Sequence, residues 1–220
     1  MKRMQKAQGF TLVEIAIVLV IIGLLLGGIL KGQEMITQAK AKNVIADFSG
    51  ISAAYHGYQD RYRSTPGDDN GAATRWAAAP AAVSGNGNGT VGGAYNADCA
   101  AASPPESCQW WDHLRRAGFI AGNGVTQPLN AAGGIVGVQT GDTAGGAALG
   151  GLSGLILCSA NLPDKIAIAV DTQMDNGLSA SGTVRAALHT AANPAIDSTT
   201  AAAAAYAETG SNLYTLCRQM

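Results

Sequence analysis

An apolar stretch near the N-terminus sets the tightest limit on how this chain can fold. The sequence GFTLVEIAIVLVIIGLLLGGIL runs from Gly9 to Leu30 and contains a single charged residue, Glu14. A helix needs about 20 apolar residues to cross the hydrocarbon core of a bilayer, and the core helix of a soluble domain rarely needs so long a run. The stretch therefore predicts a membrane-spanning helix.

The residues before this stretch indicate whether the mature protein keeps it after cleavage. Residues 1–8, MKRMQKAQ, are polar and carry Lys2, Arg3 and Lys6. A secretory signal peptide is cleaved after its apolar region, which is then lost. Here the small residue Gly9 comes before the apolar region, so cleavage after it would remove only a basic leader. The leader is expected on the cytoplasmic side of the membrane, so the rest of the chain should face away from the cytoplasm.

The residues G-F-T-L-V-E at 9–14, followed by the apolar stretch, resemble the processing site of type IV prepilins and type II secretion pseudopilins. In that family a membrane peptidase cleaves after the glycine and methylates the new amino group. The resemblance implies cleavage between Gly9 and Phe10, N-methylation of Phe10, and Glu14 as the acid at the fifth mature position. It covers the first 30 residues closely and the first 65 loosely.

Glu14 needs a partner, because a carboxylate inside a bilayer costs about 2.5–3.5 kcal/mol on insertion scales. The apolar stretch has no basic residue before Lys31, so the cation that processing supplies is the amino group of Phe10. Glu14 can pair with its own terminus, about one turn away, or with that of a neighbouring subunit, which would favour assembly and set the register. The alternative is a capping box, Thr11-x-x-Glu14, which would only stabilise the start of the helix.

The helical pattern continues beyond the apolar stretch. Apolar residues recur at spacings of three and four, which places them on one face of a helix. We predict one helix from Thr11 to Arg63, ended by Pro66-Gly67, whose second half packs on a sheet. The stripe consists of Val44, Phe48, Ile51, Tyr55, Tyr58 and Tyr62.

The expected fold is α+β and pilin-like, with the long N-terminal helix packed on a small antiparallel sheet of about four strands, as the family implies, and a loop-rich globular head. Segments 64–108 and 119–151 are predicted as loop because Gly, Asn, Ala, Ser and Pro dominate them. The expected divisions are a leader, 1–9, a transmembrane or filament-core helix, 10–30, its amphipathic continuation, 31–63, and the head, 64–220. Further helices are expected over Trp110–Gly118 and from Pro163 to Gly177, and strands over Leu155–Cys158, Thr183–Leu188 and Asn212–Arg218.

All four cysteines lie beyond the apolar stretch. An even number in an exported segment favours disulfides, and four cysteines allow three pairings. We favour Cys99–Cys108, which closes a short loop containing proline, and Cys158–Cys217, which tethers the C-terminal segment. Pilins often carry a C-terminal disulfide loop, so the resemblance supports the second pair. A cysteine metal site is disfavoured because no CxxC occurs.

Two segments of the predicted loop resemble binding motifs. Asp68 and Asp69, in GDDNG at 67–71, offer oxygen ligands for calcium, but the spacing does not fit an EF-hand and a plain turn is favoured. Residues 87–92 fit G-x-G-x-x-G, which we discount as a dinucleotide site because no strand precedes it and no helix follows. Asn88-Gly89-Thr90 matches a glycosylation sequon, a pattern that also occurs by chance.

Composition and motifs point away from catalysis and from nucleic-acid binding. The net charge is −1, and loss of residues 1–9 would take it to −4, because three positive and no negative charges are removed. Nothing in this balance suggests a nucleic-acid surface. The sequence has no G-x-S-x-G, H-E-x-x-H or P-loop motif, and its three histidines are scattered. We expect no enzyme, no cofactor and no metal.

The predicted function is that of a structural subunit of a type IV pilus or pilus-like filament. Its expected partners are the prepilin peptidase, copies of itself or related pilins, the inner-membrane assembly machinery and, before assembly, the lipid bilayer. It should wait in the bacterial inner membrane as a single-pass protein with its head outside the cytoplasm, then enter a periplasmic or cell-surface filament. Two alternatives remain: a type II secretion pseudopilin, and a membrane-anchored binding module that never polymerises and uses a Trp110–Arg116 face.

Overall fold

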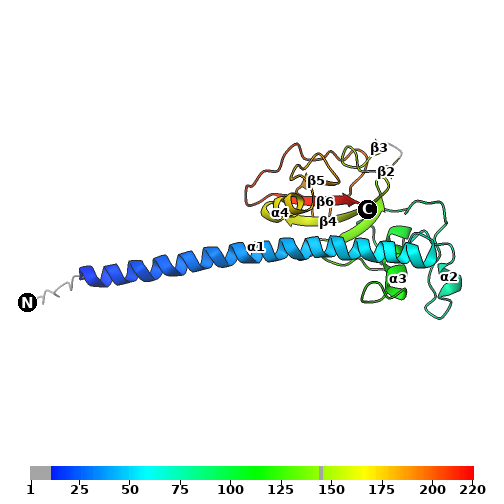
Figure 1. Ribbon diagram of the computed structural model, residues 1–220, viewed down its shortest axis with the longest axis horizontal. Helices are drawn as coiled ribbons and strands as arrows, with labels where there is room; N and C mark the ends of the chain where they lie inside the picture. The colour runs from blue at the N-terminus through cyan, green and yellow to red at the C-terminus, as the bar shows by residue number, and fades with distance from the viewer. Residues whose placement is uncertain (1–10, 144–145) are drawn as a thin grey trace, which may run out of the picture. The chain divides into compact units, whose positions relative to one another are not determined.

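The computed structural model describes residues 11–143 and 146–220 (Figure 1). Its first element is one long helix, α1, Leu12–Tyr62, within one residue of the predicted helix at each end. The helix ends where Arg63 adopts a left-handed conformation, with φ of 55°, as is common directly after a helix. The chain divides into two compact units, Met1–Ala39 and Lys40–Met220, and α1 contributes residues to both.

The second unit contains a four-stranded antiparallel sheet in the order β1-β4-β6-β5. This arrangement, with a long helix packed against it, confirms the predicted α+β, pilin-like fold. The strands of the sheet are β1 Val136–Thr140, β4 Leu155–Pro163, β5 Val184–His189 and β6 Leu213–Gln219. A separate ladder joins β2 Asp142–Thr143 to β3 Gly146–Ala147. The other helices are α2 Ala72–Arg75, α3 Glu106–Arg116 and α4 Asp164–Met174.

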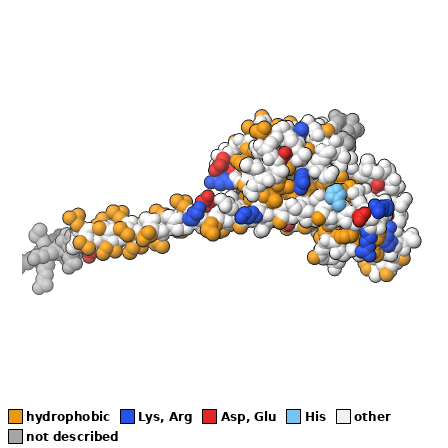
Figure 2. All heavy atoms as spheres, in the orientation of Figure 1, with side chains coloured by type: hydrophobic (Ala, Val, Ile, Leu, Met, Phe, Trp, Pro, Cys, Tyr) orange, Lys and Arg blue, Asp and Glu red, His pale blue; other side chains and the backbone are white. Residues whose placement is uncertain are grey.

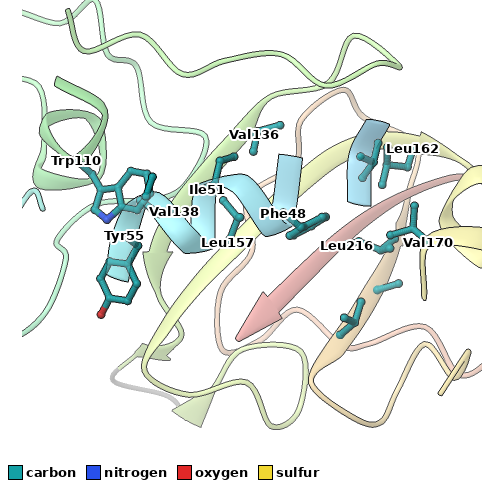
Figure 3. Packing of buried hydrophobic residues seen from close by; sticks show 14 of the residues in the cluster. Phe48, Ile51, Tyr55, Trp110, Val136, Val138, Leu157, Leu162, Val170 and Leu216 are labelled. Carbon is teal, nitrogen blue, oxygen red and sulfur yellow. The ribbon is translucent and has the colours of Figure 1, made fainter. Parts of the chain in front are cut away.

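The apolar stripe of α1 packs on one face of the sheet (Figure 3). The predicted stripe is confirmed: its first five members, from Val44 to Tyr58, are buried, and Tyr62 is half-buried. Their spacing of three and four residues keeps them on one side of a helix that turns every 3.6 residues. The strand side chains in the same cluster include Val136, Val138, Leu157, Leu162 and Leu216.

The opposite face of the sheet has its own apolar cluster. Along β4, Leu157 faces the α1 cluster, whereas Ile156 and Cys158 belong to the second cluster, as expected for side chains that alternate across a strand. The pairing of β4 with β6 is irregular between Ser159 and Leu162. This bulge shifts the alternation by one residue, so Leu162 lies with the α1 cluster again. The sheet is therefore buried on both faces.

The prediction that 64–108 is loop was wrong at α2 and at the start of α3, and the prediction that 119–151 is loop was wrong at β1 and at the short ladder of β2 and β3. The strand β1 is the largest of these differences. This strand contains Gly137, which has low strand propensity and, with Gly134 and Gly141 on either side, makes the segment resemble a loop. The structure shows why glycine is required there: a Cβ at Gly137 would collide with the backbone carbonyl oxygen of Tyr95. Close approach of another backbone segment thus determines the residue at this position, which local propensity could not reveal.

Replacing Phe48 with alanine should destabilise the head by about 3–5 kcal/mol, because Phe48 is 2% exposed and fills the contact between α1 and the sheet. Urea titration of the full chain in detergent would measure the free energy of unfolding. Ser49→Ala, at the exposed neighbouring position, is the control and should change it by less than about 0.5 kcal/mol. Equal losses in the two variants would contradict a stabilising role for the helix–sheet contact.

Candidate functional site

The N-terminal part of α1, before Lys31, exposes apolar side chains on all sides. Figure 2 shows hydrophobic side chains covering this part of the helix. Leu12, Leu24 and Leu30 are 91%, 73% and 66% exposed. By length and composition the helix is apolar enough to cross a membrane, with a mean hydropathy of 2.8 over its most apolar window. So large an apolar surface requires lipid or protein around it.

Glu14 forms a capping box at the start of α1. Its Oε2 accepts hydrogen bonds from the backbone N–H of Thr11 and from the Thr11 hydroxyl, both at 2.8 Å. The backbone N–H of Glu14 donates in return to the Thr11 hydroxyl at 3.3 Å. These are the reciprocal contacts of an N-cap residue with the third helical residue. The capping box that the sequence suggested as an alternative role for Glu14 is therefore present.

The capping box engages only one oxygen of the Glu14 carboxylate. Within the described residues, Oε1 of Glu14 has no hydrogen-bond partner. A carboxylate can accept from several donors at once, so the cap leaves room for a cationic partner on Oε1. The predicted processing residues, Gly9 and Phe10, lie outside the described residues. Capping and ion pairing are thus compatible roles for the same side chain.

The next charged residues along α1 mark the end of the apolar stretch. Lys31 donates to Glu34 at 2.8 Å, one turn further on. Both side chains are more than half exposed, so the pair contributes little to stability. Between Glu14 and Lys31 the helix has no ionisable side chain. Along α1, the apolar stretch thus separates Glu14 from Lys31, the first basic residue of the helix.

A family model described as the prokaryotic N-terminal methylation motif matches residues 4–30. The chain carries the prepilin-type N-terminal motif of the type IV pilin and pseudopilin superfamily. This motif implies processing by a prepilin peptidase and, with the apolar helix, indicates a membrane-anchored, extracytoplasmic pilin-like protein. Proteins of this superfamily are generally structural and not enzymatic. No curated protein and no solved structure matches this chain.

The head of this pilin-like chain contains two disulfides, and they are the two pairs favoured from the sequence. Cys99–Cys108 joins the loop before α3 to that helix, with the Cα atoms 5.4 Å apart. Cys158–Cys217 joins β4 to β6 at directly paired positions, with the Cα atoms 4.0 Å apart. Disulfides persist in oxidising compartments, which agrees with a head outside the cytoplasm.

The glycine-rich segment 87–92 surrounds a carboxylate of the pilin-like chain itself. Asp68 accepts hydrogen bonds from the backbone N–H groups of Gly87, Asn88 and Gly89 at 2.7–3.0 Å. Gly87 and Gly89 have φ of 72° and 85°, which favour glycine. Backbone N–H groups arranged in this way bind anions. The G-x-G-x-x-G segment therefore anchors a loop by holding a carboxylate of the same chain.

Asp69 belongs to a second internal network. The hydroxyl of Tyr58 donates to Asp69 Oδ2 at 2.5 Å, and Nη1 of Arg75 donates to the same oxygen at 2.6 Å. Burial alone would raise the pKa of Asp69, but the hydrogen bonds from Tyr58 and Arg75 outweigh burial and lower it. The oxygens of both Asp68 and Asp69 are thus engaged by groups of the chain itself, which supports the plain-turn interpretation.

Acidification should destabilise the head through Asp69. Because its pKa is lower in the folded than in the unfolded chain, its stabilising contribution is complete above the unfolded value, near 3.8, and disappears as pH falls through the folded value. Asp69→Asn cannot titrate, so its free energy of unfolding should depend less on pH below about 4. Urea titrations of both proteins across this range would test this. Identical pH slopes would contradict the assignment.

The two tryptophans of α3 are part of the core. Trp110 and Trp111 are fully buried, and Trp110 stacks on Tyr55 of α1 with ring centroids 6.5 Å apart (Figure 3). The two tryptophans therefore cannot form part of a surface binding face, and the alternative of a Trp110–Arg116 face was wrong for them. Arg115 and Arg116 are only half-buried and remain at the surface.

Proposed function

We propose that this chain is a structural subunit of a type IV pilus or pilus-like filament, processed by prepilin peptidase and assembled through its N-terminal helix. The proposal assigns residues 1–9 to a removed leader, 10–30 to the membrane and filament-core helix, 31–63 to its amphipathic continuation and 64–220 to the head. A type II secretion pseudopilin, which would form a short periplasmic filament by the same route, is the alternative within the superfamily.

The observation that carries this proposal is the N-terminal part of α1, whose apolar side chains are exposed on all sides and whose one carboxylate has an oxygen that bonds none of the described residues. In the inner membrane, lipid covers the apolar surface, but Glu14 lacks a basic side chain as a partner. In a filament, neighbouring helices replace the lipid, and the amino group of Phe10 from an adjacent copy can pair with Oε1 of Glu14. Assembly then satisfies both requirements at once.

Processing can be tested with Gly9→Ala, which adds a Cβ at the proposed cleavage site. We expect the variant to keep its leader, because the peptidase recognises the glycine, and to form no filament. N-terminal sequencing and mass spectrometry of the purified polypeptide would show Met1 in the variant and N-methylated Phe10 in the wild type. A variant that begins at Phe10 would contradict the proposed cleavage site.

Electron microscopy of cells with and without this chain tests the filament itself. Cell-surface filaments that disappear with the gene and contain the chain would support a pilus subunit. Filaments that appear only in the periplasm would support the pseudopilin alternative. A chain that starts at Phe10 but remains in the inner membrane under every growth condition would contradict a filament role of either kind.

A further inference from the structure

A pocket of about 520 Å³ lies at the C-terminal end of α3, in the head. Its charged side chains all come from α3, and its remaining walls come from two loops that are distant in sequence. Figure 2 shows Lys and Arg side chains gathered at the part of the head where α2 and α3 lie. The pocket is lined by Pro80, Asp112, Arg115, Arg116, Gly122, Asn123 and Gly124.

The pocket carries one positive charge that no acid balances. Arg116 is paired, since its Nε donates to Asp112 Oδ2 at 2.5 Å. Arg115 has no carboxylate partner within the described residues; its Nη1 donates to the carbonyl oxygens of Gly124 and Thr126 at 2.7 and 2.8 Å. These contacts hold the guanidinium in place without neutralising it. Burial lowers the pKa of Arg115 by more than the charge of nearby Asp112 raises it.

Several donors at this pocket are unused by the protein. Within the described part of the chain, Nη2 of Arg115 and Nη1 of Arg116 have no hydrogen-bond partner, and Nε of Arg115 is buried without one. The backbone N–H groups of Gly122, Asn123 and Gly124 also donate to no described group.

The nearby end of α3 presents few competing acceptors. Its carbonyl oxygens at His113, Leu114 and Arg115 accept from the backbone N–H groups that follow the helix. The carboxylate of Asp112 is 6% exposed and already engaged by Arg116. A ligand would therefore meet donors and a net positive charge.

We propose that this pocket binds a carboxylate-bearing ligand of monosaccharide size, an acidic sugar, with Arg115 as its main contact. A single carboxylate matches the net charge of +1 from Asp112, Arg115 and Arg116, whereas a phosphate dianion would exceed it and be repelled by Asp112. The unused Nη2 of Arg115 can donate a charge-assisted hydrogen bond to a carboxylate oxygen. The volume lies within the usual range of small-molecule sites, and the free amide donors suit sugar hydroxyl groups. This inference does not depend on filament assembly.

Isothermal titration of the full chain in detergent with glucuronate would test the proposal, with glucose, acetate and inorganic phosphate as comparison ligands. We expect glucuronate to bind at least about tenfold more tightly than glucose, since a charged hydrogen bond is lost without the carboxylate. Acetate and phosphate should also bind more weakly than glucuronate. The proposal is overturned if glucuronate does not bind, or if any comparison ligand binds as tightly.

Variants separate the pocket from general surface charge. Arg115→Gln should weaken glucuronate binding at least about tenfold. Arg61→Gln makes the same charge change at an exposed arginine outside the pocket and should leave binding unchanged. Because Arg115 also holds its loop, Asp112→Asn is the second variant: it removes the competing negative charge and should tighten glucuronate binding, a gain that misfolding cannot produce. Equal effects of the two arginine variants, or no gain in Asp112→Asn, would overturn the assignment of Arg115 as the contact.

Discussion

Replacing Glu14 with glutamine should stop filament assembly while the protein stays in the membrane. The substitution keeps the size of the side chain but removes its charge, so docking of a neighbouring N-terminus no longer forms an ion pair. A charge left unpaired at bilayer depth costs about 2.5–3.5 kcal/mol, which is roughly a hundredfold in an equilibrium constant. We expect filament yield, measured by shearing cells and immunoblotting, to fall by at least that factor.

Glutamine at this position also separates the two roles of Glu14. A capping box accepts glutamine as well as glutamate, so Glu14→Gln retains the contacts with Thr11 and changes only the charge. Thr11→Val is the matched variant: it removes the capping hydroxyl, at a cost of about 1 kcal/mol, and keeps the carboxylate. We expect Thr11→Val to be processed and to assemble.

Filaments of Glu14→Gln at normal yield would show that the capping box is the whole role of this residue. Loss of filaments in Thr11→Val, together with normal yield in Glu14→Gln, would also show that assembly depends on the cap and not on the charge. Fractionation of membranes is the necessary control, because a variant that is degraded or not inserted also forms no filaments. N-terminal sequencing excludes a defect in processing.

The elements that sequence predicted best are those whose pattern is local. The stripe from Val44 to Tyr58 depends only on the period of a helix, and it is buried as predicted. Both ends of α1 lie within one residue of the predicted ends. The strands β5 and β6 also begin or end within a residue or so of their predicted positions. Apolar runs and helical spacing are fixed by the residues themselves, so no knowledge of the tertiary contacts is needed.

The features that sequence could not predict depend on contacts between distant segments. Gly137 made β1 resemble a loop, although the glycine is required by the backbone of Tyr95. The pocket beside Arg115 combines α3 with loops around Pro80 and Gly122. Such juxtapositions leave no periodic signal in the chain. In the G-x-G-x-x-G segment the pattern was visible in the sequence, but the group that it binds was not. That group is the carboxylate of Asp68, about 20 residues earlier in the same chain.

Removing the Cys158–Cys217 disulfide should destabilise the head more than removing Cys99–Cys108. The sequence separations are 59 and 9 residues. In the chain-entropy account, loops of these lengths correspond to about 4 and about 2.7 kcal/mol. We therefore expect the paired alanine variants to differ by more than about 1 kcal/mol in the free energy of unfolding, measured by urea titration of the full chains in detergent.

The position of β6 in the sheet strengthens this expectation. The strand lies between β4 and β5 and is paired on both sides. If Cys217 no longer tethers β6 to β4, local separation of β6 from the sheet would remove both ladders and uncover Leu216, which lies in the same cluster as Phe48. Loss of the long-range disulfide should thus weaken the surface on which α1 packs, whereas loss of Cys99–Cys108 loosens a loop beside α3. A larger destabilisation from the short-range pair would contradict this account.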